Sequence, residues 1–195
     1  MSTPVEDKRY HHGDLGPTLR RAAQEILETE GLQALSLRSV ARRAGVSHAA
    51  PYRHYASREA LLADVACEGL AQLRAELAQA GSAEGDRAER MVRIGGAYLR
   101  FATRHEGLLR LMFGSELPNR SDFPAVAEAT ALIGEEIGRA LDDSAGGLAL
   151  WAAVHGLAML ILDDVIDLGQ KQAGLAVAPS RAEILLRSLI EMSKT

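Results

Sequence analysis

Apolar residues recur every three or four positions along almost the whole chain, a spacing typical of amphipathic α-helices. No stretch alternates apolar and polar residues as a half-buried strand would. The pattern therefore predicts an all-α fold of about nine helices, with no internal repeat and with the clearest break in the Gly81–Gly85 loop. The expected helices cover 15–30, 37–44, 47–55, 58–80, 86–105, 107–113, 123–141, 148–168 and 180–192.

The second and third of these helices are short and lie on either side of a tight turn. Ser36 is a favourable N-cap for the first of them, and Gly45 supplies the positive φ angle that such a turn requires. Pro51 is compatible only with the first turn of the following helix, which therefore begins at Ser47 or His48 and reaches Tyr55. Two short helices joined in this way are typical of a helix-turn-helix, whose second helix enters the DNA major groove.

The charge distribution agrees with a DNA-binding N-terminal part. Residues 1–58 carry nine Lys and Arg against six acidic residues, whereas the rest of the chain has a net charge of −7. An excess of basic residues at one end of an acidic protein is consistent with binding of a polyanion there. The side chains that we expect to face DNA are Arg38, Ser47, His48, Ala49, Tyr52, Arg53, His54, Tyr55 and Arg58.

The same residues carry a family resemblance. The segment from Gly31 to Ser47, followed by Tyr52-Arg-His-Tyr55 and Ser57-Arg-Glu-Ala-Leu-Leu62, closely resembles the DNA-binding domain of TetR/AcrR-family transcriptional regulators. The opening Tyr10-His-His-Gly-Asp-Leu15 and the later Trp151-x-x-x-His155-Gly156 resemble the subgroup named for a Trp-His-Gly motif. Ala50-Pro51 departs from the small residue and Leu found in many members, which affects the expected base preference.

The resemblance implies roles for individual residues. Tyr52 and Arg58 would hold phosphates, and His54 would pack or touch the DNA backbone beside them. The candidates for contact with base edges are Arg38, Ser47, His48, Ala49 and Arg53. Members of the family act as dimers on palindromic double-stranded DNA, so we expect a DNA-binding domain over 13–62 and an effector-binding and dimerisation domain over 63–195.

The family dimerises through its last two helices, which here are expected at 148–168 and 180–192. Small residues in the first of these helices permit close contact between copies. The expected dimer interface contains Ala152, Ala153, Gly156, Leu185 and Leu189.

Aromatic and sulfur-containing side chains in the second half suggest a cavity for a small apolar or amphipathic effector that releases the DNA. The alternative is that these residues only fill the core, with His155 bonded to a backbone carbonyl. The candidate pocket residues are Tyr98, Phe101, Met112, Phe113, Trp151, His155 and Met159.

Other classes of function are disfavoured. The sequence has neither a P-loop nor an HExxH motif nor a dinucleotide fingerprint, and the acidic residues after Leu162 are typical of a solvated face, so we expect no enzyme, metal or cofactor. One cysteine and a polar N-terminus favour a cytoplasmic protein, and the apolar stretch 145–162 is interrupted by His155 as a membrane span would not be. A transcriptional activator of the same fold stays open, and a non-specific architectural DNA binder is disfavoured by the net charge of −4.

Overall fold

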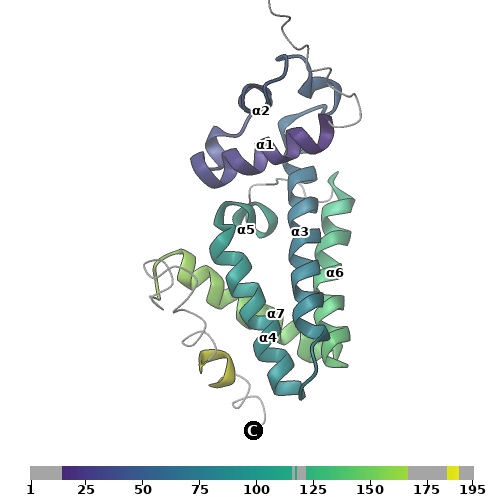
Figure 1. The fold of residues 1–195 in the computed structure, drawn as a ribbon, viewed down its shortest axis with the longest axis vertical. Coiled ribbons are helices and arrows are strands. Elements are labelled where there is room, and N and C mark those ends of the chain that lie inside the picture. The colour runs from purple at the N-terminus through teal and green to yellow at the C-terminus, as the bar shows by residue number, and fades with distance from the viewer. Residues whose placement is uncertain (1–14, 116, 118–121, 167–183, 189–195) are drawn as a thin grey trace, which may run out of the picture. The chain divides into compact units, whose positions relative to one another are not determined.

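The computed structural model describes residues 15–115, 117, 122–166 and 184–188. They form helices, turns and loops, with no strand among them, so the expected all-α fold is confirmed (Figure 1). The chain divides into two compact units, Met1–Val65 and Ala66–Thr195. The boundary falls within one long helix, α3, which spans Arg58–Ser82.

The first unit consists of three α-helices and two short 3₁₀ segments. Helix α1 buries one apolar face, on which Leu19, Ile26 and Leu27 are almost fully inaccessible. In Figure 1 helix α2 is seen end-on while α1 lies across the view, so the two cross steeply. The elements are α1 (Leu15–Glu30), η1 (Leu32–Ala34), α2 (Leu37–Ala44), η2 (Pro51–Arg53) and the start of α3.

Both ends of α2 form as the sequence predicts. Ser36 accepts a hydrogen bond from the Ser39 N–H at 3.1 Å, and the Ser36 N–H donates to the Ser39 hydroxyl at 2.9 Å. This capping box satisfies backbone donors that a helix start leaves unpaired. Gly45 ends the helix with a φ of 68°, a left-handed conformation that a side chain would strain.

The second unit is a helical bundle of α4 to α7 together with the rest of α3. Helix α7 packs against both α4 and α6, and Leu186 of the helical segment 184–188 and Val154 of α7 both lie beside Gly95 of α4. The elements are α4 (Arg87–Arg104), α5 (Glu106–Phe113), α6 (Pro124–Leu141) and α7 (Ser144–Leu162).

Helices α6 and α7 approach closely because glycines meet where they join. A Cβ on Gly147 would lie 2.7 Å from the backbone of Gly138, so no larger residue fits there. Asp143 caps α7 by accepting from the Gly146 N–H at 2.9 Å. Because α7 packs directly against the backbone of α6 at this point, the two helices are fixed in one register.

Both ends of α7 differ from the sequence prediction by several residues, whereas the other described α-helices differ by two residues at most. Helix α7 begins at Ser144 instead of Leu148 because Asp143 provides its cap, and it ends at Leu162 instead of Leu168. Asp164 has a φ of 56°, and adjacent carboxylates oppose the helix dipole at this end. The expected helix at 180–192 is described only over 184–188.

Candidate nucleic-acid interface and helical core

The segment that follows the α2 turn, residues 47–55, is here called the reading segment. Val46 directly precedes the reading segment, and its N–H donates to the Ala41 carbonyl at 3.0 Å. The expected short helix forms as turns and the 3₁₀ element η2, because Pro51 has no N–H to donate. The Tyr55 N–H closes the segment on the Pro51 carbonyl at 2.9 Å. The segment is therefore a compact helical turn on the surface of the first unit.

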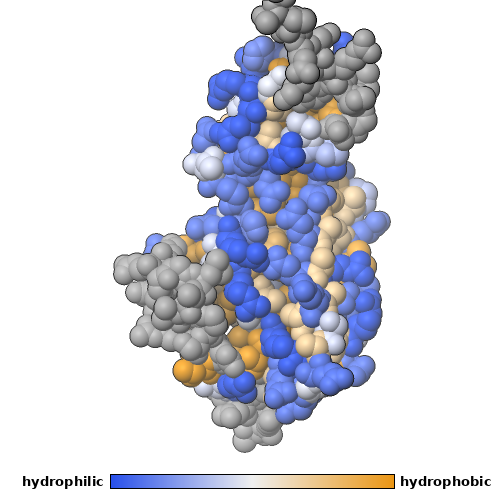
Figure 2. Space-filling view, in the orientation of Figure 1, coloured by the Kyte–Doolittle hydropathy of each residue, from blue (hydrophilic) through white to orange (hydrophobic). Residues whose placement is uncertain are grey.

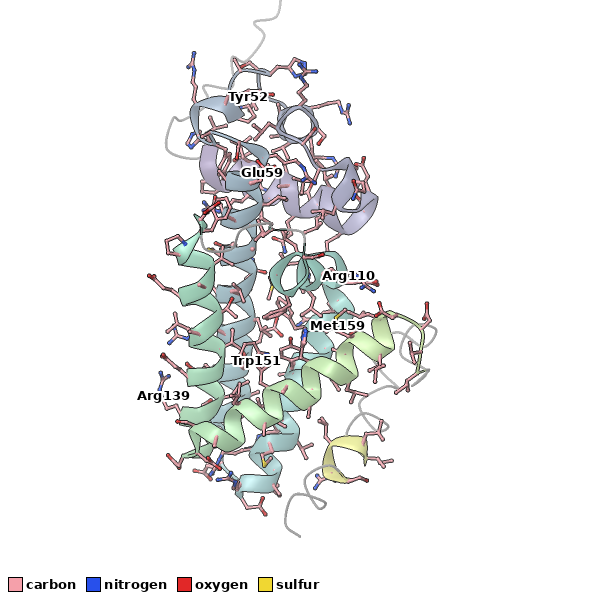
Figure 3. All side chains as sticks on the ribbon, turned by 180° about the vertical axis from the view of Figure 1, so that it is seen from behind. Tyr52, Glu59, Arg110, Arg139, Trp151 and Met159 are labelled. Carbon is pink, nitrogen blue, oxygen red and sulfur yellow. The ribbon has the colours of Figure 1, made fainter. Side chains whose placement is uncertain are left out.

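Most of the residues expected to contact DNA are exposed. Tyr52 is 54% exposed although it is aromatic, and it is labelled on the outer side of the unit in Figure 3. Pro51 beside it is buried and anchors the turn. The other exposed members of the set are Arg38, Ser47, His48, Ala49, Arg53 and His54. One helical turn and the start of α2 thus present hydroxyl, imidazole and guanidinium donors, the groups that read base edges and phosphates.

Tyr55 has a different role from the one that the sequence suggested. It is only 7% exposed, and its hydroxyl donates to Asp64 Oδ2 at 2.6 Å, so it is not available to DNA. Arg20 donates to the same oxygen at 3.1 Å. Burial and the Asp64 carboxylate raise the pKa of the Tyr55 hydroxyl. The three side chains join α1, the reading segment and α3.

Arg58 also acts within the fold. Its Nε donates to the Leu35 carbonyl at 2.7 Å, and another guanidinium nitrogen donates to the Leu32 carbonyl at 2.9 Å. These bonds hold the connection between α1 and α2, so two of the guanidinium nitrogens of Arg58 donate within the protein. No local pattern in the sequence indicates this contact, because it joins residues more than twenty positions apart.

Arg42 was not selected from the sequence, yet it is exposed in the last turn of α2. Its neighbour Arg43 forms ion pairs with Glu25 and Glu30 and is thereby held on the protein. The doubled arginine in the sequence was the available signal, although it does not show which of the two is engaged.

Four of the expected effector residues, from α4, α5 and α7, lie together in the second unit. Tyr98 is 1% exposed, and its hydroxyl lies 2.8 Å from His155 Nδ1. The Phe113 ring packs edge-on against both Trp151 and His155, with centroid distances of 5.9 Å and 4.9 Å. The structure therefore brings four of the residues together, and His155 bonds to a side chain instead of a backbone carbonyl.

The other three candidate pocket residues differ in how deeply they are buried. Phe101 and Met112 are fully buried, which fits the simple core role, whereas Met159 is half-buried on α7 (Figure 3). A separate open groove of about 550 Å³ between α3 and α4 contains none of the predicted residues. Its lining is Glu76, Gln79, Ala80, Ala97, Arg100 and Arg104.

Helix α7 also exposes apolar surface. Leu148 is 59% and Leu160 is 41% exposed, and Ala152, Ala153 and Gly156 are exposed between them. Leu185 is exposed on the segment 184–188, where Figure 2 shows apolar atoms at the surface, and Leu189 lies outside the described residues. Within the described part of the chain, α7 is the one helix long and apolar enough to cross a membrane, and a third of its apolar window is buried.

A helix-turn-helix with an exposed donor-rich turn, followed by a helical bundle, defines a DNA-binding regulator. Residues 19–65 match the family model of bacterial regulatory proteins, tetR family. Residues 91–177 match the model of a tetracyclin repressor-like C-terminal domain. Together the two models span more than half of the sequence, and the chain belongs to the TetR family of DNA-binding transcriptional regulators.

Solved structures share this fold over nearly their whole length. A protein of unknown function from Rhodococcus sp. RHA1 is 31% identical, with a TM-score of 0.67, over 93% of this chain and 98% of that one. A regulatory protein in the tetR family from Rhodococcus RHA1 is 18% identical, with a TM-score of 0.69, over 90% and 96%. The fatty acid degradation regulator FadR from Bacillus halodurans is 12% identical, with a TM-score of 0.69, over 91% and 97%. No curated protein matches the chain.

Proposed function

We propose that the protein is a homodimeric, ligand-responsive repressor that binds a palindromic operator in the cytoplasm. The observation that carries the proposal is the exposed reading segment, whose donors stand on a turn anchored by buried Pro51. The working division of the chain is a DNA-binding domain over 13–62 and an effector-binding and dimerisation domain over 63–195.

The exposed donors divide into two groups by the contact expected of them. Tyr52 and His54 contact phosphates, and Arg42 is an additional phosphate ligand. Donors exposed beside a segment that enters the groove lie next to the DNA backbone. Base edges are read by Arg38 and Arg53 and by the segment's first residues, Ser47, His48 and Ala49. Arg58 and Tyr55 support this surface through hydrogen bonds to other parts of the first unit.

Dimerisation is supported by the exposed face of α7. A Cβ on Gly156 would meet no atom within 4 Å, so nothing within the chain requires a glycine there. A second copy packing its α7 across Ala152, Ala153 and Gly156 would use this absence of side chains for close helix contact. Leu148 and Leu160, both strongly exposed, would be covered in the same contact.

The Trp-His-Gly subgroup is part of the proposal and rests on Trp151, His155 and Gly156. The first two line the inner side of α7 with Phe113, and the third lies on its exposed side. One helix would thereby carry the effector contact and the dimer contact together. Ligand binding could then change how two copies pack and so change the spacing of their reading segments.

Two variants test the DNA-binding surface. Arg53→Ala should weaken binding to the operator more than binding to random DNA, whereas Tyr52→Phe should weaken both about equally. Both side chains are exposed, so neither substitution removes a core contact. Fluorescence anisotropy with labelled operator and random duplexes measures both effects, and parent-like operator binding by both variants would contradict the proposed surface.

A further inference from the structure

An open groove on the second unit, here called the α3–α4 groove, belongs to none of the surfaces to which a role has been given. It has a volume of about 550 Å³, within the usual range of small-molecule sites. A hollow can form here because the apolar part of the lining consists only of alanine methyl groups. Its lining residues are Glu76, Gln79 and Ala80 on α3 and Ala97, Arg100 and Arg104 on α4.

Arginine side chains bridge the two helices on both sides of the alanines. Helices α3 and α4 are consecutive and meet at the short loop that joins them (Figure 1). Near this loop, Arg93 of α4 donates to the Ala80 carbonyl at 3.3 Å and to the Ala83 carbonyl at 2.8 Å. Farther from the loop, Arg104 forms an ion pair with Glu76 at 2.5 Å. The α3–α4 groove is therefore bounded at each end by a contact between the helices.

Between these two bridges, Arg100 provides a positive charge without a counter-ion. The residue is exposed, and within the described part of the chain its side chain makes no hydrogen bond or ion pair. A Cβ added to Gly96 would lie 3.2 Å from Arg100 Nη1, so the guanidinium lies back along α4 over a residue without a side chain. Glu76 is already paired with Arg104. The lining thus has two guanidinium groups against one carboxylate, and Arg100 keeps its donors for a ligand.

These groups define the chemistry of a matching ligand. A guanidinium binds a carboxylate well, because its N–H groups can donate to both oxygens at once. The methyl groups of Ala80 and Ala97 suit a compact apolar body, and Gln79 on the exposed side of α3 can bond to a further polar atom. An ammonium group would meet the excess positive charge, and the second charge of a phosphate ester would lie uncompensated near Glu76.

We propose that the α3–α4 groove binds a small organic monocarboxylate, whose carboxylate pairs with Arg100 and whose apolar body lies against Ala80 and Ala97. The site is separate from the reading segment and from the seven candidate pocket residues. The inference goes beyond the proposed function and does not require that the protein bind DNA.

Saturation-transfer NMR on the full-length protein tests the preference for a carboxylate. The probes are benzoate, benzamide, benzylammonium and phenyl phosphate, which share a ring and differ in the head group. Benzoate should bind saturably with a Kd of roughly 1–10 mM, because an exposed ion pair contributes only modestly. The other three should bind about fivefold more weakly. No saturable binding of benzoate, or another probe that binds as tightly, would overturn the inference.

A pair of arginine variants locates the site. Arg100→Gln removes the unpaired charge and should weaken benzoate binding about fivefold. Arg139→Gln is the matched control, because it removes the same charge from an exposed arginine of α6 that does not line the groove (Figure 3). Its affinity for benzoate should equal that of the parent. Parent-like binding by Arg100→Gln, or equal weakening by both variants, would overturn the role of Arg100.

A third variant tests the apolar part of the groove without changing any charge. Ala80→Leu places a larger side chain in the groove and should abolish saturable benzoate binding. Circular dichroism establishes that the variant is folded, and parent-like affinity in the folded variant would overturn the location of the site. Arg100 is exposed, so Arg100→Gln removes no core contact and remains decisive if Ala80→Leu does not fold.

Discussion

Tyr55 connects the reading segment to the rest of the first unit, and removing its hydroxyl tests that connection. The hydroxyl donates to Asp64 Oδ2 at 2.6 Å, and the phenol is 7% exposed. A hydrogen bond to a charged acceptor contributes about 1.5–3 kcal/mol. The Asp64 side chain is 36% exposed and keeps Arg20, so we expect Tyr55→Phe to cost about 1–2 kcal/mol, or roughly 2–8 °C in Tm.

A double-mutant cycle isolates the interaction. Asp64→Ala leaves a buried hydroxyl without an acceptor and should cost about 2–3 kcal/mol, more than Tyr55→Phe. In the Asp64→Ala background, Tyr55→Phe should cost little, because the bond has already been lost. Thermal unfolding followed by circular dichroism gives all four stabilities. Equal losses for Tyr55→Phe in both backgrounds would refute the reasoning.

The stabilisation that Tyr55 contributes to the fold should be lost at high pH. Folding raises the pKa of Tyr55 above its ordinary value of 10.0, so the protonated phenol is favoured in the folded state. The stabilisation is complete below pH 10 and is lost as the pH rises above this value. The parent should therefore lose more stability than Tyr55→Phe on going from neutral pH to above pH 10, and parallel pH profiles would contradict this.

Three further substitutions test other parts of the fold. Gly147→Ala should lower stability by about 3 kcal/mol or more, because its Cβ would lie 2.7 Å from the Gly138 backbone; parent-like thermal unfolding would refute this contact. Gly45→Ala should cost about 1 kcal/mol in denaturant unfolding, since the residue has a φ of 68°, and no loss would contradict the turn geometry. Arg58→Met should lower stability by about 2 kcal/mol, because the guanidinium donates to two carbonyls. The same variant should leave the salt slope of DNA binding unchanged. A slope reduced by about one would instead show a phosphate contact.

The parts of the fold that local signals govern were predictable from the sequence. Ser36 and Gly45 determine the ends of α2 through contacts a few residues apart, and Ser57 caps α3 by accepting from the Ala60 N–H at 3.2 Å. The exposed turn at Tyr52 follows from the same local pattern. Such signals involve neighbouring residues, so a single sequence contains them.

Contacts between distant residues were not predictable. Arg20 and Asp64 are 44 positions apart, and no pattern in the sequence indicates that they meet or that Tyr55 joins them. The contacts that Tyr55 and Arg58 make within the protein were not expected for this reason, since either residue type serves equally well in a DNA interface and in a structural contact. The C-terminus of α7 depends on the left-handed Asp164, which propensity alone does not specify.

The central claim is that this chain binds a specific DNA sequence as a dimer through its reading segment. The most direct measurement is fluorescence anisotropy of the purified protein with DNA from upstream of its own gene and with a scrambled duplex, over a series of salt concentrations. We predict tight binding of two chains per operator and much weaker, more salt-dependent binding to the scrambled duplex. Absence of binding to either duplex would contradict the assignment of residues 47–55 as a DNA-reading surface.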